Sequence, residues 1–267
     1  MSGNASFVGA IPQHYDRHLG PVIFDPYARD LARRVEHRAG LRVLELACGT
    51  GILTRRLLER LPADAHLVAT DLNGAMISHA RTVVPGDARV EWREADAQAL
   101  PLPDGSFDAV VCQFGFMFLP DRPAGLREAK RVLRPGGQFL FSVWDSLAKN
   151  PFGRIAHESI TSFFPESPPN FYLTPFGWHD ARDVRATTAG AGFRDVQLET
   201  VACEAQSESA HSFSTGLVHG NPVATAIRER GVDPDTVRAA VERKLAAAWG
   251  AAPCRGPMSA HVASARA

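Results

Sequence analysis

Short runs of apolar residues alternate with longer amphipathic segments between residues 41 and about 144. This alternation is typical of βαβ units, whose strands form a mostly parallel sheet. The runs that we interpret as strands are residues 42–46, 66–70, 89–93, 107–112 and 138–144. The pattern therefore predicts an α/β fold over this part of the chain.

The segments between these runs have helical spacing. Residues 50–61 place Ile52, Leu53, Leu57, Leu58 and Leu61 on one face, and Pro62 stops the helix. Residues 122–133 predict a second helix, which the sequence "RPGG" at 134–137 ends. Strand texture returns at 193–201 and 258–265, with a mostly helical stretch at 209–249 between them.

Residues 150–179 are rich in Phe and Pro and lack strand alternation, which favours an insertion or lid over a site. The alternative is a connector whose aromatic rings only cover the sheet. If the segment is a lid, its rings could form an apolar wall that binds a flat small molecule. These rings are Phe163, Phe164, Phe171, Tyr172, Phe176 and Trp178.

Composition and charge exclude several classes of protein. The 267 residues contain 29 Lys plus Arg and 29 Asp plus Glu, without a dense basic run, so we expect no nucleic-acid partner. The four cysteines are scattered without a C-x-x-C pair, which argues against a zinc site and a disulfide framework. The first residues do not resemble a secretory signal, and no apolar run is long enough to span a membrane. We therefore expect a cytoplasmic protein without a metal site.

The stretch "VLELACGTG" at 43–51 joins a buried strand to a glycine turn, with the carboxylate of Glu45 just before the turn. The third glycine of a dinucleotide-binding fingerprint would fall at Thr54, and Glu45 would repel a pyrophosphate. A ligand with a cationic amine beside a ribose suits these residues better, because a carboxylate can hold an ammonium directly or through water. The methionyl end of S-adenosylmethionine has this chemistry.

Four stretches in order resemble the class I S-adenosylmethionine-dependent methyltransferases, whose first motif is E-x-x-C/G-G-x-G. They are "ELACGTG", "LVATDLNGAMI", "READAQALPLPDGSFDAVVCQFGFMFLPD" and "REAKRVLRPGGQFLFSVWD". The resemblance is closest to small-molecule enzymes such as those of ubiquinone and menaquinone biosynthesis. It implies one domain over residues 1–267, with a Rossmann-like, mostly parallel seven-stranded sheet, one antiparallel strand and helices on both faces. It also implies a helical cover at 1–40 and a lid at about 146–180.

The resemblance further implies which residues bind the cofactor. Asp71 would meet the ribose hydroxyls, and Asp96 with Ala97 would face the adenine. Asp71 could instead cap the helix that begins near Asn73, and Asp96 could be a turn residue. The full set of expected cofactor residues is Tyr15, Glu45, Ala47, Gly49, Thr50, Gly51, Asp71, Leu72, Met76, Asp96, Ala97 and Gln113.

The function that follows is methyl transfer from S-adenosylmethionine to a small, apolar or aromatic acceptor. The rival interpretations are an NAD(P)-dependent oxidoreductase and a non-catalytic S-adenosylmethionine-binding protein. A sulfonium donor is already activated, so no catalytic residue is obligatory. The histidines in segments that could face the acceptor are His14, His18, His157, His179 and His219, and the sequence favours none of them as a base. The acceptor, the methylated atom and the oligomeric state are left open by the sequence.

Overall fold

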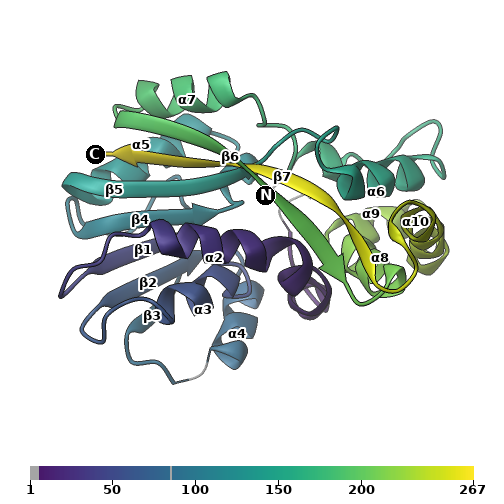
Figure 1. The fold of residues 1–267 in the computed structure, drawn as a ribbon, viewed down its shortest axis with the longest axis horizontal. Helices are drawn as coiled ribbons and strands as arrows, with labels where there is room; N and C mark the ends of the chain where they lie inside the picture. The colour runs from purple at the N-terminus through teal and green to yellow at the C-terminus, as the bar shows by residue number, and fades with distance from the viewer. Residues whose placement is uncertain (1–5, 85) are drawn as a thin grey trace.

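A seven-stranded sheet with the strand order β3-β2-β1-β4-β5-β7-β6 forms the centre of the protein (Figure 1). The computed structural model describes residues 6–84 and 86–267. Its strands are β1 Arg42–Leu46, β2 His66–Asp71, β3 Val90–Glu94, β4 Phe107–Gln113, β5 Leu133–Trp144, β6 Arg194–Ser207 and β7 Cys254–Arg266. Pairing is parallel from β3 to β5, and β7 runs antiparallel to both β5 and β6. The predicted mostly parallel sheet with one antiparallel strand is confirmed.

Helices cover both faces of this sheet, as predicted. Helices α2, α3 and α4 lie on one face, whereas α5 and α7 pack together on the other (Figure 1). Beyond the ends of β6 and β7, helices α6, α8, α9 and α10 form a separate group. The helices are α1 Ile11–His14, η2 Tyr15–Phe24, α2 Asp25–Arg34, α3 Ile52–Leu58, α4 Gly74–Val83, η3 Phe116–Phe118, α5 Arg122–Val132, α6 Pro151–Thr161, η4 Phe171–Leu173, α7 Ala181–Gly190, α8 Ala210–His219, α9 Val223–Glu229 and α10 Pro234–Trp249. None of the helices within the described ranges is long and apolar enough to cross a membrane.

Burial explains why the central strands read as apolar runs. Strands β1 and β4 are buried almost throughout, because helices cover both of their faces. Strand β6 lies at the edge of the sheet and exposes most of its side chains. Because β6 contains many polar residues, the apolar pattern predicted a strand over 193–201 only and missed the rest of β6.

Strand β5 begins five residues before the predicted start at 138. Leu133 pairs with Phe107, and regular pairing resumes where Gln138 meets Ala109. The "RPGG" sequence lies between these pairs as an irregularity, with Gly136 at φ 77°. Because a positive φ suits glycine, the turn residues that end α5 also form a bulge within the strand.

The first described helices form a continuous cover from Ile11 to Arg34. The middle of this cover, η2, is a π-helix, in which the Asp25 N–H donates to the carbonyl of Gly20, five residues earlier. Pro21 lies inside it and has no N–H to donate. The cover packs closely against α8, since a Cβ added to Gly216 would lie 2.7 Å from Leu19. The cover thus links the sheet to the second group of helices.

Candidate functional site

A cavity of about 370 Å³ lies at the carboxyl ends of β1, β2, β3 and β4. Strands β1 and β4 are neighbours although β2 and β3 separate them in sequence, so the strand order reverses here. Open α/β sheets bind ligands at such a switch point. The lining comes from the loops after these strands, from the N-terminal segment and from the region of η3: Phe7, Tyr15, Ala47, Gly49, Asp71, Leu72, Asn73, Met76, Ala95, Asp96, Ala97, Gln98, Gln113, Phe114, Gly115, Phe118, Leu119 and Pro120.

The loop after β1 has the backbone that its glycines predict. Gly49 and Gly51 have φ values of 55° and 79°, in the left-handed region. Gly51 is also tightly packed, because an added Cβ would lie 3.3 Å from the side chains of Ala80 and Val84. The third fingerprint position, Thr54, is buried under the loop. Gly49 thus faces the cavity, whereas Gly51 supports the loop from below.

Asp71 holds the loops after β1 and β2 together. Its carboxylate accepts from the N–H of Gly49 at 2.9 Å and from the N–H of Asn73 at 2.8 Å. The side chain lines the cavity, and its burial raises the pKa of the carboxyl above the ordinary value. The contact with Asn73, the N-cap residue of α4, resembles the capping role that was the alternative for Asp71. Contact with a ribose stays a prediction.

Asp96 both lines the cavity and makes a hydrogen bond within a turn. It lines the cavity, and its Oδ1 accepts from the N–H of Gln98 at 2.8 Å, which is a turn contact. Gln113, at the end of β4, donates from Nε2 to the carbonyl of Phe24 at 2.8 Å. Its Oε1 is buried and has no hydrogen-bond partner among the described residues. This oxygen is therefore an unused acceptor on a residue of the cavity wall.

Three expected cofactor residues lie behind the wall. Glu45 is 1% exposed and accepts from the Oγ1 of Thr54 at 2.6 Å. Burial raises the pKa of Glu45 to about 8. Thr50 donates to Asp16 at 3.1 Å, and Gly51 packs against α4. The other expected residues, Tyr15, Ala47, Gly49, Asp71, Leu72, Met76, Asp96, Ala97 and Gln113, all line the cavity.

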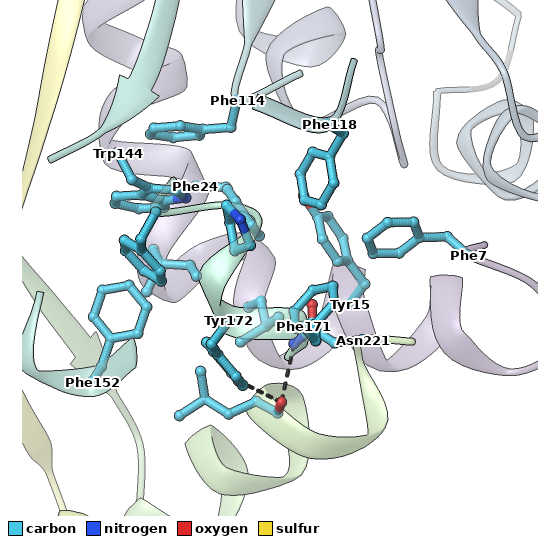
Figure 2. A pocket seen from close by; sticks show the side chains of 15 residues that line it. Phe7, Tyr15, Phe24, Phe114, Phe118, Trp144, Phe152, Phe171, Tyr172 and Asn221 are labelled. Atoms are coloured by element: carbon cyan, nitrogen blue, oxygen red, sulfur yellow. Dashed lines mark hydrogen bonds between the residues drawn. The ribbon is translucent and has the colours of Figure 1, made fainter. Parts of the chain in front are cut away.

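A second cavity of about 50 Å³ shares a wall with the first (Figure 2). The shared residues are Phe7, Tyr15, Phe114 and Phe118. Its other lining residues are Leu19, Ile23, Phe24, Trp144, Phe152, Phe171, Tyr172, Pro175, Phe176, Leu217 and Asn221. Phe114 stacks on Trp144 with ring centroids 4.0 Å apart, and Tyr15 stacks on Phe24 at 4.7 Å. The second cavity is therefore almost entirely aromatic and aliphatic.

The predicted aromatic wall from the 146–180 segment is only partly correct. Phe171, Tyr172 and Phe176 line the second cavity, but Phe163, Phe164 and Trp178 do not. Trp178 stacks on Phe141 of β5 and donates from Nε1 to Asp183 at 2.7 Å. Its ring therefore belongs to the core beneath α7, because the chain turns back to the sheet before that helix.

The expected histidines do not face either cavity. Instead, His14 lies 5.9 Å from His18 and 5.7 Å from His219, measured between ring centroids, where the cover meets α8. His179 contacts the carbonyl of Phe176 at 2.8 Å, and His157 lies on α6. The ionisable side chains that do line the cavities are Asp71, Asp96, Tyr15 and Tyr172. Burial, with the charges of Asp71 and Asp16, raises the pKa of Tyr15, so its hydroxyl stays protonated.

Sequence reasoning missed Phe114 and Asn221. Phe114 has a φ of 54°, a conformation that is uncommon for a bulky residue, directly after β4. The sequence gives no signal for this backbone, because Phe has no preference for positive φ. Asn221 follows α8, far from the motifs, and only the packing of the cover on α8 brings it to the site. No group of three or more His, Cys, Asp or Glu residues within the described ranges could hold a metal ion.

Comparison with known proteins identifies the central part of the chain. Residues 43–137 match the family model described as a methyltransferase domain. The chain is also 41% identical over 107 residues to the ubiquinone/menaquinone biosynthesis C-methyltransferase UbiE of Hahella chejuensis. Residues 43–137 are therefore similar to methyltransferase domains. That alignment covers 39% of this chain and 43% of the relative, so the chain spans less than half the length of this curated relative.

Solved structures are similar to this chain over more of its length than residues 43–137. The YcgJ protein from Bacillus subtilis superimposes with a TM-score of 0.59 at 16% identity, covering 90% of this chain and 98% of that one. The [4+2]-cyclase SpnF superimposes with a TM-score of 0.59 at 20% identity, covering 91% and 80%. At these identities the likeness shows the fold alone.

Glu45 should make the stability of the protein depend on pH. Its pKa is raised from 4.5 to about 8 in the folded chain, so the unfolded chain loses this proton first as the pH rises. Wild type should therefore lose stability between about pH 4.5 and pH 8 relative to Glu45→Gln, which does not titrate and can still accept from Thr54. We expect the difference in free energy of unfolding between wild type and Glu45→Gln to change by more than about 1.4 kcal/mol over this pH range. One pKa unit corresponds to this free energy. Urea denaturation at a series of pH values measures this difference. Glu166→Gln, at an exposed position, is the control, and a pH-independent difference for Glu45→Gln would contradict the prediction.

Proposed function

We propose that this protein transfers a methyl group from S-adenosylmethionine to a small, apolar or aromatic acceptor. The observation that carries the proposal is the cavity at the switch point, whose acceptors match the donors of that cofactor. Asp71 suits the ribose hydroxyls, and Asp96 suits the adenine amine. The unpartnered Oε1 of Gln113 suits the ammonium group. Glu45, behind the wall, is a proposed partner of the ammonium through water only.

The cavity walls also suit the apolar parts of the cofactor. Leu72 and Met76 offer aliphatic surface to an adenine plane, and Gly49 allows close backbone approach. When bound, the cofactor supplies an electrophilic methyl group on a sulfonium. The aromatic residues shared by the two cavities exclude water from the space between donor and acceptor, and they fix the direction of approach. Tyr15, protonated at this junction, can donate a hydrogen bond but does not act as a base at neutral pH.

The second cavity is the proposed acceptor site. Its volume of about 50 Å³ is small beside the roughly 150 Å³ of an engineered apolar cavity that binds benzene. An aromatic acceptor therefore enters only when lining side chains move. Phe171, Tyr172, Pro175 and Phe176 all belong to the 146–180 segment, which supports a lid role for it. We accordingly propose one domain over 1–267, with a cover at 1–40 and a lid at about 146–180.

The rival functions are less well supported. Thr54 stands where a dinucleotide fingerprint has its third glycine, and its hydroxyl donates to Glu45 below the loop, so the loop lacks the complete fingerprint. The fold is also that of a [4+2]-cyclase, so it does not by itself establish methyl transfer. The balanced charge argues against nucleic acid, and the free cysteines suit a reducing cytoplasm.

Cofactor binding distinguishes the proposed function from that of an NAD(P)-dependent oxidoreductase, whereas a non-catalytic S-adenosylmethionine-binding protein would bind the same ligands. Because the cavity carries carboxylates and lacks a complete dinucleotide loop, we expect S-adenosylmethionine and S-adenosylhomocysteine to bind, and NAD and NADP not to bind. Isothermal titration calorimetry on the full chain measures all four. Tight NAD binding without a response to S-adenosylhomocysteine would overturn the proposed function.

Asp71 should contribute strongly to this binding. Asp71→Ala removes a charged acceptor, whose hydrogen bonds are worth roughly 1.5 to 3 kcal/mol, so affinity for S-adenosylhomocysteine should fall about tenfold or more. Asp71→Asn keeps the shape but not the charge and should show a smaller loss. Melting curves establish that both variants fold. Unchanged affinity in folded Asp71→Ala would leave Asp71 with the capping role alone.

The lid should select the acceptor rather than hold the cofactor. Phe171 lines only the second cavity, so Phe171→Ala should change the dissociation constant for S-adenosylhomocysteine by less than about threefold. Phe164→Ala removes a buried ring of the same segment that lines neither cavity, and it controls for a general loss of packing. Calorimetry beside thermal melting measures both variants. Loss of cofactor affinity in Phe171→Ala, but not in Phe164→Ala, would place this ring in the cofactor site.

A further inference from the structure

Asn221 lines the apolar cavity, and its two polar side-chain atoms differ in their hydrogen bonds. The residue is 7% exposed and follows the end of α8. Its Nδ2 donates to the carbonyl oxygen of Gly216, at 3.3 Å, and to that of Leu217, at 3.1 Å. Figure 2 shows the bond to Leu217. Both partners are acceptors, so the amide nitrogen must face them and Oδ1 must face away. No donor among the described residues contacts Oδ1.

None of the hydrogen bonds among the described residues has Oδ1 of Asn221 as its acceptor. The other side chains with hydrogen-bonding atoms that line this cavity within the described ranges are Tyr15, Trp144 and Tyr172, and none of them donates to Oδ1. Tyr172 already donates its hydroxyl proton to the carbonyl of Leu217 at 2.6 Å (Figure 2). A ligand that donates a hydrogen bond to Oδ1 would give this acceptor a partner.

Close packing places Asn221 next to the boundary of the two cavities. A Cβ added to Gly220, the preceding residue, would lie 3.2 Å from the backbone N and Cα of Tyr15. Tyr15 lines both cavities, so the chain at Gly220 touches the junction where donor and acceptor would meet. Asn221 itself lines the apolar cavity, so its Oδ1 is in reach of an acceptor held there.

We propose that Oδ1 of Asn221 selects acceptors that carry a hydrogen-bond donor. The inference rests on the proposed function and narrows its acceptor class to apolar ring compounds with a hydroxyl or N–H group. Sites that hydrogen-bond a substrate group reject analogues that lack it, because the buried partner is left unpaired. Hydrocarbons and ethers of the same size should therefore bind poorly.

Phenol and anisole test this selectivity, because they share one ring and differ in the donor. Ligand-observed NMR titrations of the full chain, with and without S-adenosylhomocysteine, give both dissociation constants. We expect wild type to prefer phenol over anisole and Asn221→Leu to reduce this preference about tenfold. Asn221→Ala gives the same comparison if the leucine variant does not fold.

Tyr172→Phe is the matched control. It also removes a hydrogen bond to the carbonyl of Leu217, but it leaves Oδ1 in place. The preference for phenol should persist in Tyr172→Phe if Oδ1 is the selective atom. If Asn221 only caps α8, the asparagine and tyrosine variants should behave alike.

Three results would overturn the inference: equal binding of phenol and anisole to wild type, an unchanged preference in the Asn221 variants, or no binding of either probe. Calorimetry with S-adenosylhomocysteine tests the proposed function independently of the two probes. A protein that binds this cofactor but does not discriminate the probes contradicts the role of Asn221 only. A protein that discriminates the probes but binds no S-adenosylhomocysteine contradicts the proposed function only.

Discussion

The hydrogen bonds accepted by Asp71 are the interaction on which the site depends. One joins the loop after β1 to the end of β2, and the other orders the start of α4. A carboxylate buried to this extent favours its neutral form, and the two N–H donors oppose that tendency. The same carboxylate faces the cavity. One side chain, Asp71, therefore both shapes the glycine loop and offers a carboxylate to a ligand.

The aromatic junction, formed by the four residues that line both cavities, is a second constraint on the site. These residues are Phe7, Tyr15, Phe114 and Phe118, and the junction depends on a strained backbone conformation at Phe114. Phe114 adopts a positive φ, which costs free energy, and its ring stacks face to face on Trp144. In this conformation the ring lies between the two cavities instead of continuing the direction of β4. The closeness of the cavities thus depends on the packing of Phe114 against β5 and the cover.

The sequence predicted those parts of the fold and site that local patterns encode. The buried strands, the glycine loop and the acidic residues at the ends of β2 and β3 combine period, turn chemistry and spacing, and the structure brings Gly49, Asp71 and Asp96 to one cavity. The pattern could not show that Glu45 lies behind the wall, because burial depends on what packs over the loop. Trp178 was misplaced for a related reason: aromatic content does not say which surface a ring covers. Asn221 was missed because it reaches the site through contacts between segments about two hundred residues apart in the chain.

In the proposed reaction, the aromatic rings of the junction would affect ligand binding rather than the rate of methyl transfer. Aromatic faces attract a cation, an effect worth about 0.5 to 2 kcal/mol per ring. Under the proposed function, Tyr15, Phe114 and Phe118 would therefore favour a sulfonium-bearing ligand over a product whose sulfur is neutral. Attraction that is strongest before transfer does not lower the barrier, since only interactions stronger in the transition state do so. Its effect is on exchange: once the charge has left the sulfur, the same rings hold the neutral product less tightly than the donor. Under the proposed function the junction would therefore serve binding and product release, while acceleration would come from alignment and from the exclusion of water by the apolar cavity.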